Sequence, residues 1–192
     1  MRTVKRDLLA LITLTLLGAL SLAGCAPAPA PQASETNGPT EAPVFASDEE
    51  ALAAATEAYA AYLAMSDQIL AEGGADPERI RAFTTERLAD IEMEGFANVR
   101  SSGFRSVGES QFSELALQDQ GKPGKAGRGM LSAYVCSDVS GVDVVDANGE
   151  SVVKDVRPDF TPFVISFDLI SKDPIKLLVA GADVWDGPGV CK

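Results

Sequence analysis

The first residues of the chain have the three-part pattern of an export signal. Arg2, Lys5 and Arg6 form a short basic start, and an apolar run from Leu8 to Leu20 follows them. The run is shorter than a bilayer-spanning helix needs, and small residues come directly after it. This order is typical of a secretory signal peptide. We therefore expect residues 1–24 to be removed and the remaining chain to fold outside the cytosol.

A cysteine stands immediately after those small residues. The segment Leu22-Ala23-Gly24-Cys25 resembles the lipobox of bacterial lipoproteins. In that family the cysteine thiol receives a diacylglyceryl group, the signal is cut before it, and the cysteine becomes the first mature residue. The resemblance implies a lipid-anchored protein at the cell membrane, on its extracellular or periplasmic side, because two acyl chains give stable anchoring without a spanning helix. The alternative is an ordinary secretory signal with an incidental cysteine.

The net charge of the chain excludes one class of partner. The formal net charge is −12, and removing the basic signal segment makes the mature chain more acidic still. Such a surface repels phosphate backbones and anionic lipid headgroups. We therefore expect no nucleic-acid partner. Contact with the membrane is expected through the lipidated Cys25.

The chain contains no histidine. Histidine is the usual general base near neutral pH and the commonest metal ligand, so Ser-His-Asp triads, Cys-His pairs and His-based zinc sites are excluded. Chemistry through Asp, Glu, Tyr or Lys remains open. The expectation is a protein without enzymatic activity and without a cofactor.

The remaining cysteines predict a disulfide. The chain has three cysteines, and lipidation consumes Cys25. The other two, Cys136 and Cys191, belong to a chain exported to an oxidising compartment, where thiols tend to pair. We expect a Cys136–Cys191 bond that holds the C-terminal tail against the body of the domain. The alternative is a pair of reduced, buried thiols.

Composition separates a linker from the folded domain. Residues 25–46 are rich in Pro and Ala and show no periodic apolar face, so this stretch predicts a disordered tether. Ser47, followed three residues later by Glu50, has the pattern of a capping box at the start of a helix. We therefore expect the folded domain to occupy residues 47–192.

The first half of this domain has helical spacing. A long apolar stripe begins after Ser47 and should end at Gly73-Gly74, a typical helix terminator. Asp76-Pro77 predicts a second, short helix with aspartate as its cap and proline at its first position. A third helix is expected over about 85–99, with Gly95 as a point where it could bend.

The second half has the spacing of strands. Residues 107–117 look extended, 130–139 and 142–145 read as strands, and Asn148-Gly149 is a strong hairpin-turn signal. Two further strands are expected over 163–170 and 175–185. Helices followed by strands predict an α+β domain with a mostly antiparallel sheet.

This order of elements resembles the nuclear-transport-factor-2-like fold, in which a curved sheet wraps around a helix. The spacing of Cys136, Asp138 and Ser140, and Val184-Trp185 before the last cysteine, are similar to lipoproteins of that type from actinobacteria. The resemblance covers about residues 47–192 and implies a conical cavity between helix and sheet. Its catalytic members, the SnoaL-like cyclases, often use a His–Asp pair, and this chain has no histidine to match it.

Four residues are candidates for lining such a cavity. Tyr59 and Tyr62 lie on the stripe of the first helix, and Trp185 ends the last strand; aromatic rings with polar tips suit small ligands. The alternative for all three is packing in the core or at its rim. Strict alternation places Asp138 on one strand face with Tyr134 and Cys136. It is either a hydrogen-bonded structural aspartate or a ligand contact.

An acidic turn invites a calcium interpretation. Asp143, Asp146, Asn148 and Glu150 surround Gly149, but aligning that glycine with the sixth position of an EF-hand loop puts Val144 where the first carboxylate should be. A solvated turn explains the same residues, and no metal site is expected.

Together these patterns predict a membrane-anchored extracytoplasmic lipoprotein that acts as a non-catalytic binding or protein-interaction module. Its expected partners are an envelope protein or a small apolar ligand. The alternative is a SnoaL-like isomerase or hydrolase that uses Asp or Tyr without histidine. An enclosed pocket with converging polar groups would favour a small-molecule site, and an exposed apolar patch would favour a protein partner.

Overall fold

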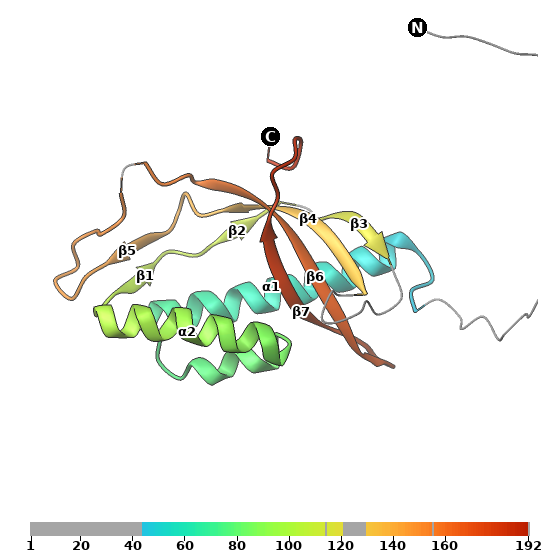
Figure 1. Ribbon diagram of the computed structural model, residues 1–192, viewed down its shortest axis with the longest axis horizontal. Helices are drawn as coiled ribbons and strands as arrows, with labels where there is room; N and C mark the ends of the chain where they lie inside the picture. The colour runs from blue at the N-terminus through green and yellow to red at the C-terminus, as the bar shows by residue number, and fades with distance from the viewer. Residues whose placement is uncertain (1–43, 114, 121–129, 155, 192) are drawn as a thin grey trace, which may run out of the picture. The chain divides into compact units, whose positions relative to one another are not determined.

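A computed structural model describes residues 44–113, 115–120, 130–154 and 156–191. The predicted signal peptide, Cys25 and all but the end of the predicted tether lie outside the described residues. The elements, in chain order, are α1 (Asp48–Ala71), the 3₁₀ helix η1 (Pro77–Ala82), α2 (Glu86–Ser102), β1 (Arg105–Val107), β2 (Gln111–Phe112), β3 (Ala116–Gln120), β4 (Leu131–Asp138), β5 (Asp143–Val145), β6 (Phe160–Lys172) and β7 (Ile175–Val184) (Figure 1).

The predicted capping box begins α1. The Ser47 side chain accepts a hydrogen bond from the backbone N–H of Glu50, and the Glu50 carboxylate accepts one from the N–H of Ala46. These bonds satisfy N–H groups that have no partner inside the helix. The helix then buries one face against the sheet, which includes Ala51, Ala55, Tyr59, Tyr62, Ser66 and Ile69.

The folded domain begins earlier than the sequence predicted. Phe45, placed in the tether, is buried in the core with 6% of its surface exposed, and Val44 packs against that core. The boundary at residue 47 is therefore too late. Val44 and Phe45 follow the Pro/Ala-rich stretch directly, and two adjacent apolar residues carry no periodic signal.

The second and third helices follow the prediction with two differences. Asp76 precedes η1 in a left-handed conformation (φ 46°), and its side chain makes no capping hydrogen bond. The third helix, α2, runs straight through Gly95 and ends at Gly103, where φ is 69°. Its buried residues, Leu88, Ala89 and Phe96, share one helical face.

The strands form one main antiparallel sheet in the order β2-β4-β6-β7, and β3 pairs with β4 on the same edge as β2. The stretch expected to be extended over 107–117 is divided between β1, β2 and β3. The two strands β1 and β5 pair separately as a small antiparallel sheet. β6 and β7 make the longest ladder and form a hairpin that passes beside α1 (Figure 1).

The turn expected at Asn148-Gly149 forms, with a short antiparallel hairpin around it. Gly149 has a φ of 84°, and its N–H bonds the carbonyl of Asp146. Backbone hydrogen bonds of 2.9 Å run from Asp146 to the Glu150 carbonyl and from Val152 to the Val144 carbonyl, and Val145 bridges Ser151. The longer ladder of β5 is with the distant β1. The local turn signal is therefore confirmed, and the pairing of β5 with β1 is an additional contact that the sequence did not predict.

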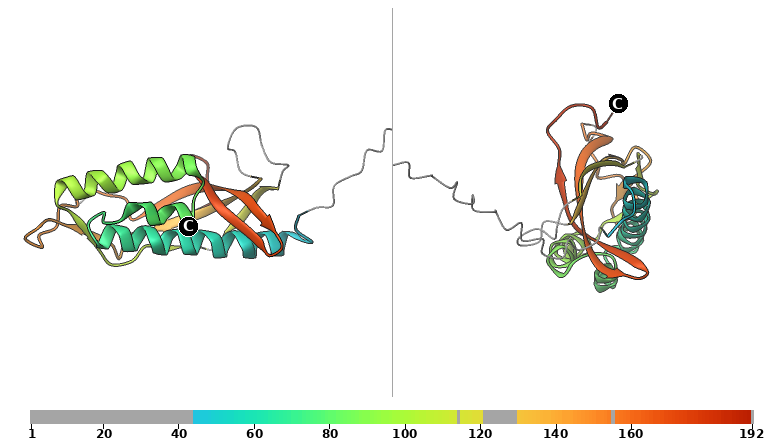
Figure 2. Two further views of the ribbon diagram at one scale, coloured as in Figure 1. Left: turned by 90° about the horizontal axis from the view of Figure 1, so that it is seen from below. Right: turned by 90° about the vertical axis from the view of Figure 1, so that its right-hand side faces the viewer.

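The core lies between the helices and one face of the curved sheet. Figure 2 shows the helices on one side of the strands, with the sheet curling past α1. The largest fully buried side chains include Ile69, Ile80, Phe167 and Ile165. The predicted α+β class, with N-terminal helices on a curved, mostly antiparallel sheet, is confirmed, and it is the arrangement expected of a nuclear-transport-factor-2-like cone.

Candidate binding cleft on the outer face of the sheet

β4 presents two different faces. Leu131, Ala133 and Val135 point to the core cluster, as their burial shows. Tyr134 and Asp138 alternate with them and point away from the core, because successive side chains in a strand lie on opposite faces. Cys136 shares this outer face. The alternation expected from the sequence is therefore present.

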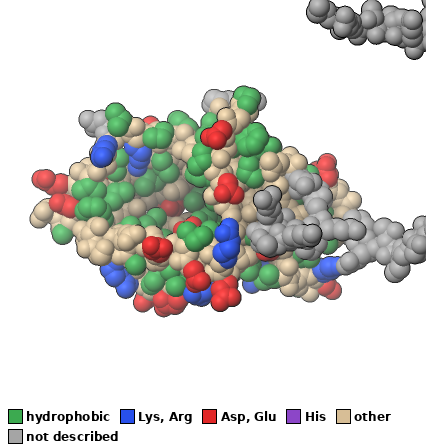
Figure 3. Space-filling view, viewed as in Figure 1, with side chains coloured by type: hydrophobic (Ala, Val, Ile, Leu, Met, Phe, Trp, Pro, Cys, Tyr) green, Lys and Arg blue, Asp and Glu red, His purple; other side chains and the backbone are tan. Residues whose placement is uncertain are grey.

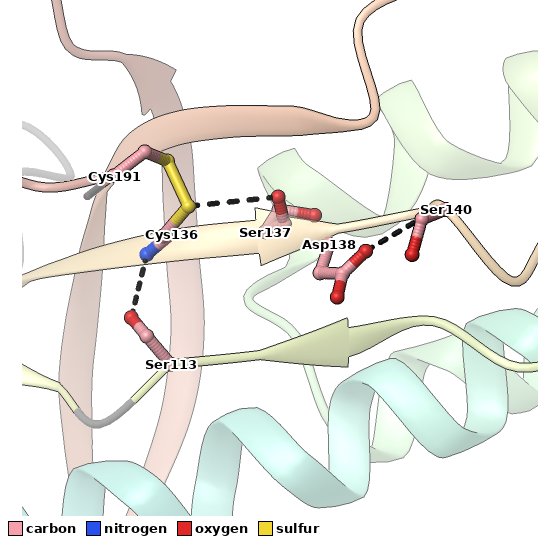
Figure 4. Close-up of a disulfide and its surroundings, with 6 residues drawn as sticks. All are labelled: Ser113, Cys136, Ser137, Asp138, Ser140 and Cys191. Atoms are coloured by element: carbon pink, nitrogen blue, oxygen red, sulfur yellow. Dashed lines mark hydrogen bonds between the residues drawn. A yellow bond between two sulfur atoms is a disulfide. The ribbon is translucent and has the colours of Figure 1, made fainter.

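The outer face carries the predicted disulfide. The sulfur atoms of Cys136 and Cys191 are bonded at 1.96 Å, and their Cα atoms lie 5.0 Å apart (Figure 4). The backbone N–H of Cys136 donates to the Ser113 hydroxyl at 2.9 Å, and this hydroxyl comes from the segment that follows β2. The bond thus ties the end of the chain to the middle of the sheet.

The tail is fixed at a second point close to the first. After β7, the backbone N–H of Trp185 donates to the carbonyl of Pro162 at 2.9 Å. Pro162 is the cross-strand partner of Cys136 in the β4–β6 ladder. Residues 186–190 therefore form an arch whose two ends meet at one cross-strand pair. We call this segment the tail arch.

A cleft of about 760 Å³ opens between the tail arch and the outer face of the sheet. Its size falls within the range of small-molecule sites. Hydrophobic side chains gather around the tail in the space-filling view (Figure 3). The side chains that give the cleft its character are Tyr134, Phe160, Trp185, Val190, Gln111 and Asp138.

The indole of Trp185 is held by its contact with Gly187 in the tail arch. A Cβ built on Gly187 would lie 2.3 Å from Cζ2 and 2.6 Å from Nε1 of the indole, so only glycine leaves room for the ring. On its other side the indole packs on Tyr134, with ring centroids 4.9 Å apart and a tilt of 58°. Trp185 thus lies between the tail arch and β4.

Asp138 is a hydrogen-bonded, half-buried aspartate. Its carboxylate accepts from the backbone N–H of Ser140 at 2.9 Å (Figure 4). Hydrogen bonds from the Ser140 side chain and backbone hold the pKa of Asp138 below its usual value. The carboxylate is therefore ionised at neutral pH. It agrees with the interpretation as a structural aspartate, and it also lies within the lining of the cleft.

The Arg157 side chain, which lies outside the cleft, holds the loop that follows Asp138. The Arg157 guanidinium donates two hydrogen bonds of 2.9 Å, to the carbonyls of Val139 and Val142. The N–H of Val139 in turn donates to the carbonyl of Asp159 at 2.8 Å. These bonds fix the chain directly after the strand, and so they position the charged end of the cleft.

Tyr59 and Tyr62 lie elsewhere. They are 4% and 8% exposed in the core, on the other side of the sheet from Trp185. Tyr59 packs edge-on against Phe112 with ring centroids 5.0 Å apart. The packing interpretation holds for these two residues. The structure brings Asp138 and Trp185 together, and it does not bring the tyrosines to them.

The sequence analysis did not predict one half-buried carboxylate, that of Glu92. The Tyr62 hydroxyl donates to the Glu92 carboxylate at 2.8 Å. Burial raises the pKa of Glu92, and the bond from Tyr62 partly opposes this shift. Burial also raises the pKa of Tyr62, and it raises that of Tyr59 to about 12. The spacing of Glu92 from Leu88 and Phe96 was the available signal, because residues four apart share a helical face.

The carboxylates of the acidic turn accept hydrogen bonds from neighbouring groups within the same segment. Asp146 accepts from the N–H groups of Asn148 and Glu150 at 2.8 and 2.9 Å, and these bonds lower its pKa. Asp143 accepts from the Ser151 hydroxyl at 2.7 Å. Within the described part of the chain, no group of three acidic or cysteine side chains is arranged to hold a metal ion.

A second, smaller cleft of about 550 Å³ lies between α1 and the segment joining β1 to β2. Its carboxylate, Asp67, accepts from both the N–H and the hydroxyl of Ser110 at 2.8 Å. Those two bonds tie the β1–β2 connection to α1 and give Asp67 a structural role. Of the helices in the described residues, none is long and apolar enough to cross a bilayer.

Comparison with known proteins gives one structural similarity. No family model matches the chain, and the comparison with curated proteins gives no match. The 1.8 Å structure of Aln2 from a Streptomyces species is similar to the chain, with 17% identity and a TM-score of 0.43. The similarity covers 72% of this chain and 90% of Aln2. The fold assignment therefore rests on the arrangement of the elements themselves.

Proposed function

We propose that this protein is a membrane-anchored extracytoplasmic lipoprotein whose α+β domain is a non-catalytic binding module. The observation that carries the proposal is the cleft under the tail arch. It combines an apolar lining with a few polar groups, as binding sites for small molecules do, and the Cys136–Cys191 bond closes it. A disulfide in this place suits a domain that works outside the cytosol.

The polar groups of the cleft support binding over catalysis. Asp138 is the one carboxylate among the described lining residues, and its lowered pKa makes it a weak proton acceptor. The Tyr134 hydroxyl accepts a hydrogen bond from the Gln118 amide at 3.0 Å. The groups with raised pKa values lie elsewhere: Tyr59 and Tyr62 are buried in the core, and the half-buried Glu92 accepts the hydrogen bond of Tyr62.

The Leu22–Cys25 segment supports the lipid anchor, and mass spectrometry of the intact protein tests it. The protein extracted from membranes with detergent should lack residues 1–24 and carry a diacylglyceryl group on Cys25. A Cys25→Ser variant should keep its signal segment and lose the lipid. A full-length, unlipidated wild-type chain recovered from the cytosol would contradict the anchor.

The binding role is tested on the lipid-anchored protein in nanodiscs of zwitterionic lipid. A panel of small amines, acids and neutral aromatic compounds is screened for quenching of tryptophan emission, because Trp185 is the only tryptophan of the chain. The proposal expects at least one saturable ligand. It also expects Tyr134→Ala to weaken the binding of that ligand, and the exposed-site variant Glu94→Gln to leave its affinity unchanged. A panel without any saturable ligand would count against the binding role.

A further inference from the structure

Resting on the proposed binding function, we infer that the cleft under the tail arch takes a small organic cation with an apolar body, such as an aromatic amine or a quaternary ammonium compound. The apolar body would lie against the rings of Trp185, Tyr134 and Phe160. The positive group would face Asp138 at the end of β4.

Charge is the first argument for this class of ligand. Asp138 lines the cleft, and no ion pair among the described residues involves it. Its bonds come from Ser140, which leaves the negative charge without a cationic neighbour in the described lining. The whole chain is acidic, with a formal net charge of −12, so its field attracts cations and repels anions.

The aromatic rings are the second argument. Trp185 and Tyr134 pack as a tilted pair, and Phe160, which lines the same cleft, is 55% exposed. Faces of Trp, Tyr and Phe attract ammonium groups through the ring quadrupole, by about 0.5–1 kcal/mol at exposed sites and more where water is excluded. A ligand that covers Phe160 would also remove its apolar surface from water.

Register places Phe160 next to the Asp138 carboxylate and the Trp185–Tyr134 pair farther along the same face. Phe160 is the cross-strand partner of Asp138 in the β4–β6 ladder, so their side chains stand on the same face as near neighbours. Tyr134 lies two positions farther along that face of β4, beyond Cys136, and Trp185 packs on Tyr134 from the end of β7. All four side chains line the same cleft, in which a carboxylate with one ring beside it and an aromatic pair farther along matches an organic cation better than an anion.

Two probes of one shape and opposite charge test this inference. Benzyltrimethylammonium and phenylmethanesulfonate are titrated separately into the lipid-anchored protein in zwitterionic nanodiscs, and Trp185 emission is recorded. We expect saturable binding of the ammonium compound and at least tenfold weaker binding of the sulfonate. Asp138→Asn should weaken the binding of the ammonium compound about threefold to fivefold, as loss of a partly exposed ion pair does. Glu94→Gln, which removes the same charge from α2, should change its affinity by less than about 1.5-fold.

Each alternative outcome overturns the inference in a different way. Equal binding of the two probes, or equal effects of Asp138→Asn and Glu94→Gln, would show that Asp138 does not select the charge. Absence of binding by both probes would reject the cation class. A neutral or anionic compound that quenches Trp185 in the wider panel would reject the cation class as well and leave the binding role standing.

Discussion

The Tyr62 hydroxyl donates a 2.8 Å hydrogen bond to the Glu92 carboxylate and so joins α1 to α2 inside the domain. Tyr62 is 8% exposed, and both partners have pKa values raised mainly by burial. A carboxylate in such a place depends on its donor, because few water molecules can replace it.

Removing that donor should destabilise the domain. Tyr62→Phe keeps the ring and leaves the half-buried Glu92 carboxylate without its hydrogen bond, at a cost of about 1–3 kcal/mol. Urea denaturation at pH 7, followed by circular dichroism, measures the free energy of unfolding. Tyr134→Phe is the control, because its hydroxyl bonds an exposed amide, and its loss should cost less. Equal costs for the two variants would contradict a special role for the Tyr62–Glu92 bond.

The same pair predicts a dependence of stability on pH. Burial raises the pKa of Glu92 in the folded state above the ordinary value of a glutamate. The folded state therefore binds this proton more tightly than the unfolded state, and stability is lost as pH rises through the folded-state pKa. Glu92→Gln keeps an acceptor for Tyr62 without the charge, so we expect it to remove this loss.

The measurement is the difference in unfolding free energy between Glu92→Gln and the wild type from pH 3.5 to 7.5. The difference should move in favour of the variant as pH rises above 4.5. Glu94→Gln, on the exposed side of the same helix, should show a flatter difference. A Glu92→Gln difference that stays constant over this range would show that the carboxylate does not titrate differently in the folded state.

Gly187→Ala should displace the indole of Trp185. The added Cβ would lie 2.3 Å from the ring, so the indole has to leave its place on Tyr134. We expect a red-shifted tryptophan emission and loss of probe binding in the cleft, with little change in the free energy of unfolding. Gly189→Ala does not serve as a control, because Gly189 has a φ of 91°, which strains any residue with a Cβ. Unchanged emission of Gly187→Ala would contradict the packing of Trp185 against Gly187.

Cys191→Ser should release the tail arch. The bond closes a loop of 55 residues, and its loss costs about 4 kcal/mol in the chain-entropy model. The domain should unfold at a lower denaturant concentration, and the cleft should lose the wall formed by the tail. Cys136→Ser should give the same change, and the double variant should give no further loss. Additive losses would show that the two cysteines act independently.

Two glycines on the helical side of the domain should respond to alanine in opposite directions. A Cβ at Gly74 would lie 2.2 Å from the Phe96 carbonyl oxygen, and its φ is 76°, so Gly74→Ala should destabilise by several kcal/mol. Gly95 is inside α2 with nothing within 4 Å of the built Cβ, so Gly95→Ala should stabilise by about 1 kcal/mol. Thermal unfolding compares them, and equal shifts would contradict the contact with Phe96.

Local patterns predicted most of the elements. The capping box at Ser47 set the start of α1, and period-two alternation placed Tyr134, Cys136 and Asp138 on one face of β4. The cysteine count predicted the Cys136–Cys191 bond. Each of these inferences depends on a few neighbouring residues or on the chemistry of the compartment. Distant contacts in the folded domain do not alter such local features.

Features that depend on distant contacts were missed. β5 pairs with β1, about forty residues earlier in the chain, and no local signal selects that partner. The burial of Glu92 became visible only once α1 supplied Tyr62. The cleft itself depends on the tail arch returning to the Cys136–Pro162 pair, so the sequence supplied two of its residues, Asp138 and Trp185, without its location on the outer face.

The tail arch spans its two attachment points without adding a strand to the sheet. Both points, the Trp185 N–H bond and the disulfide, meet at one rung of the β4–β6 ladder. Lengthening or shortening residues 186–190 would therefore change the distance between the tail arch and the sheet and leave the sheet itself unchanged. A change in the length of this segment would therefore alter the size of the molecule that the cleft admits, with the interior packing preserved.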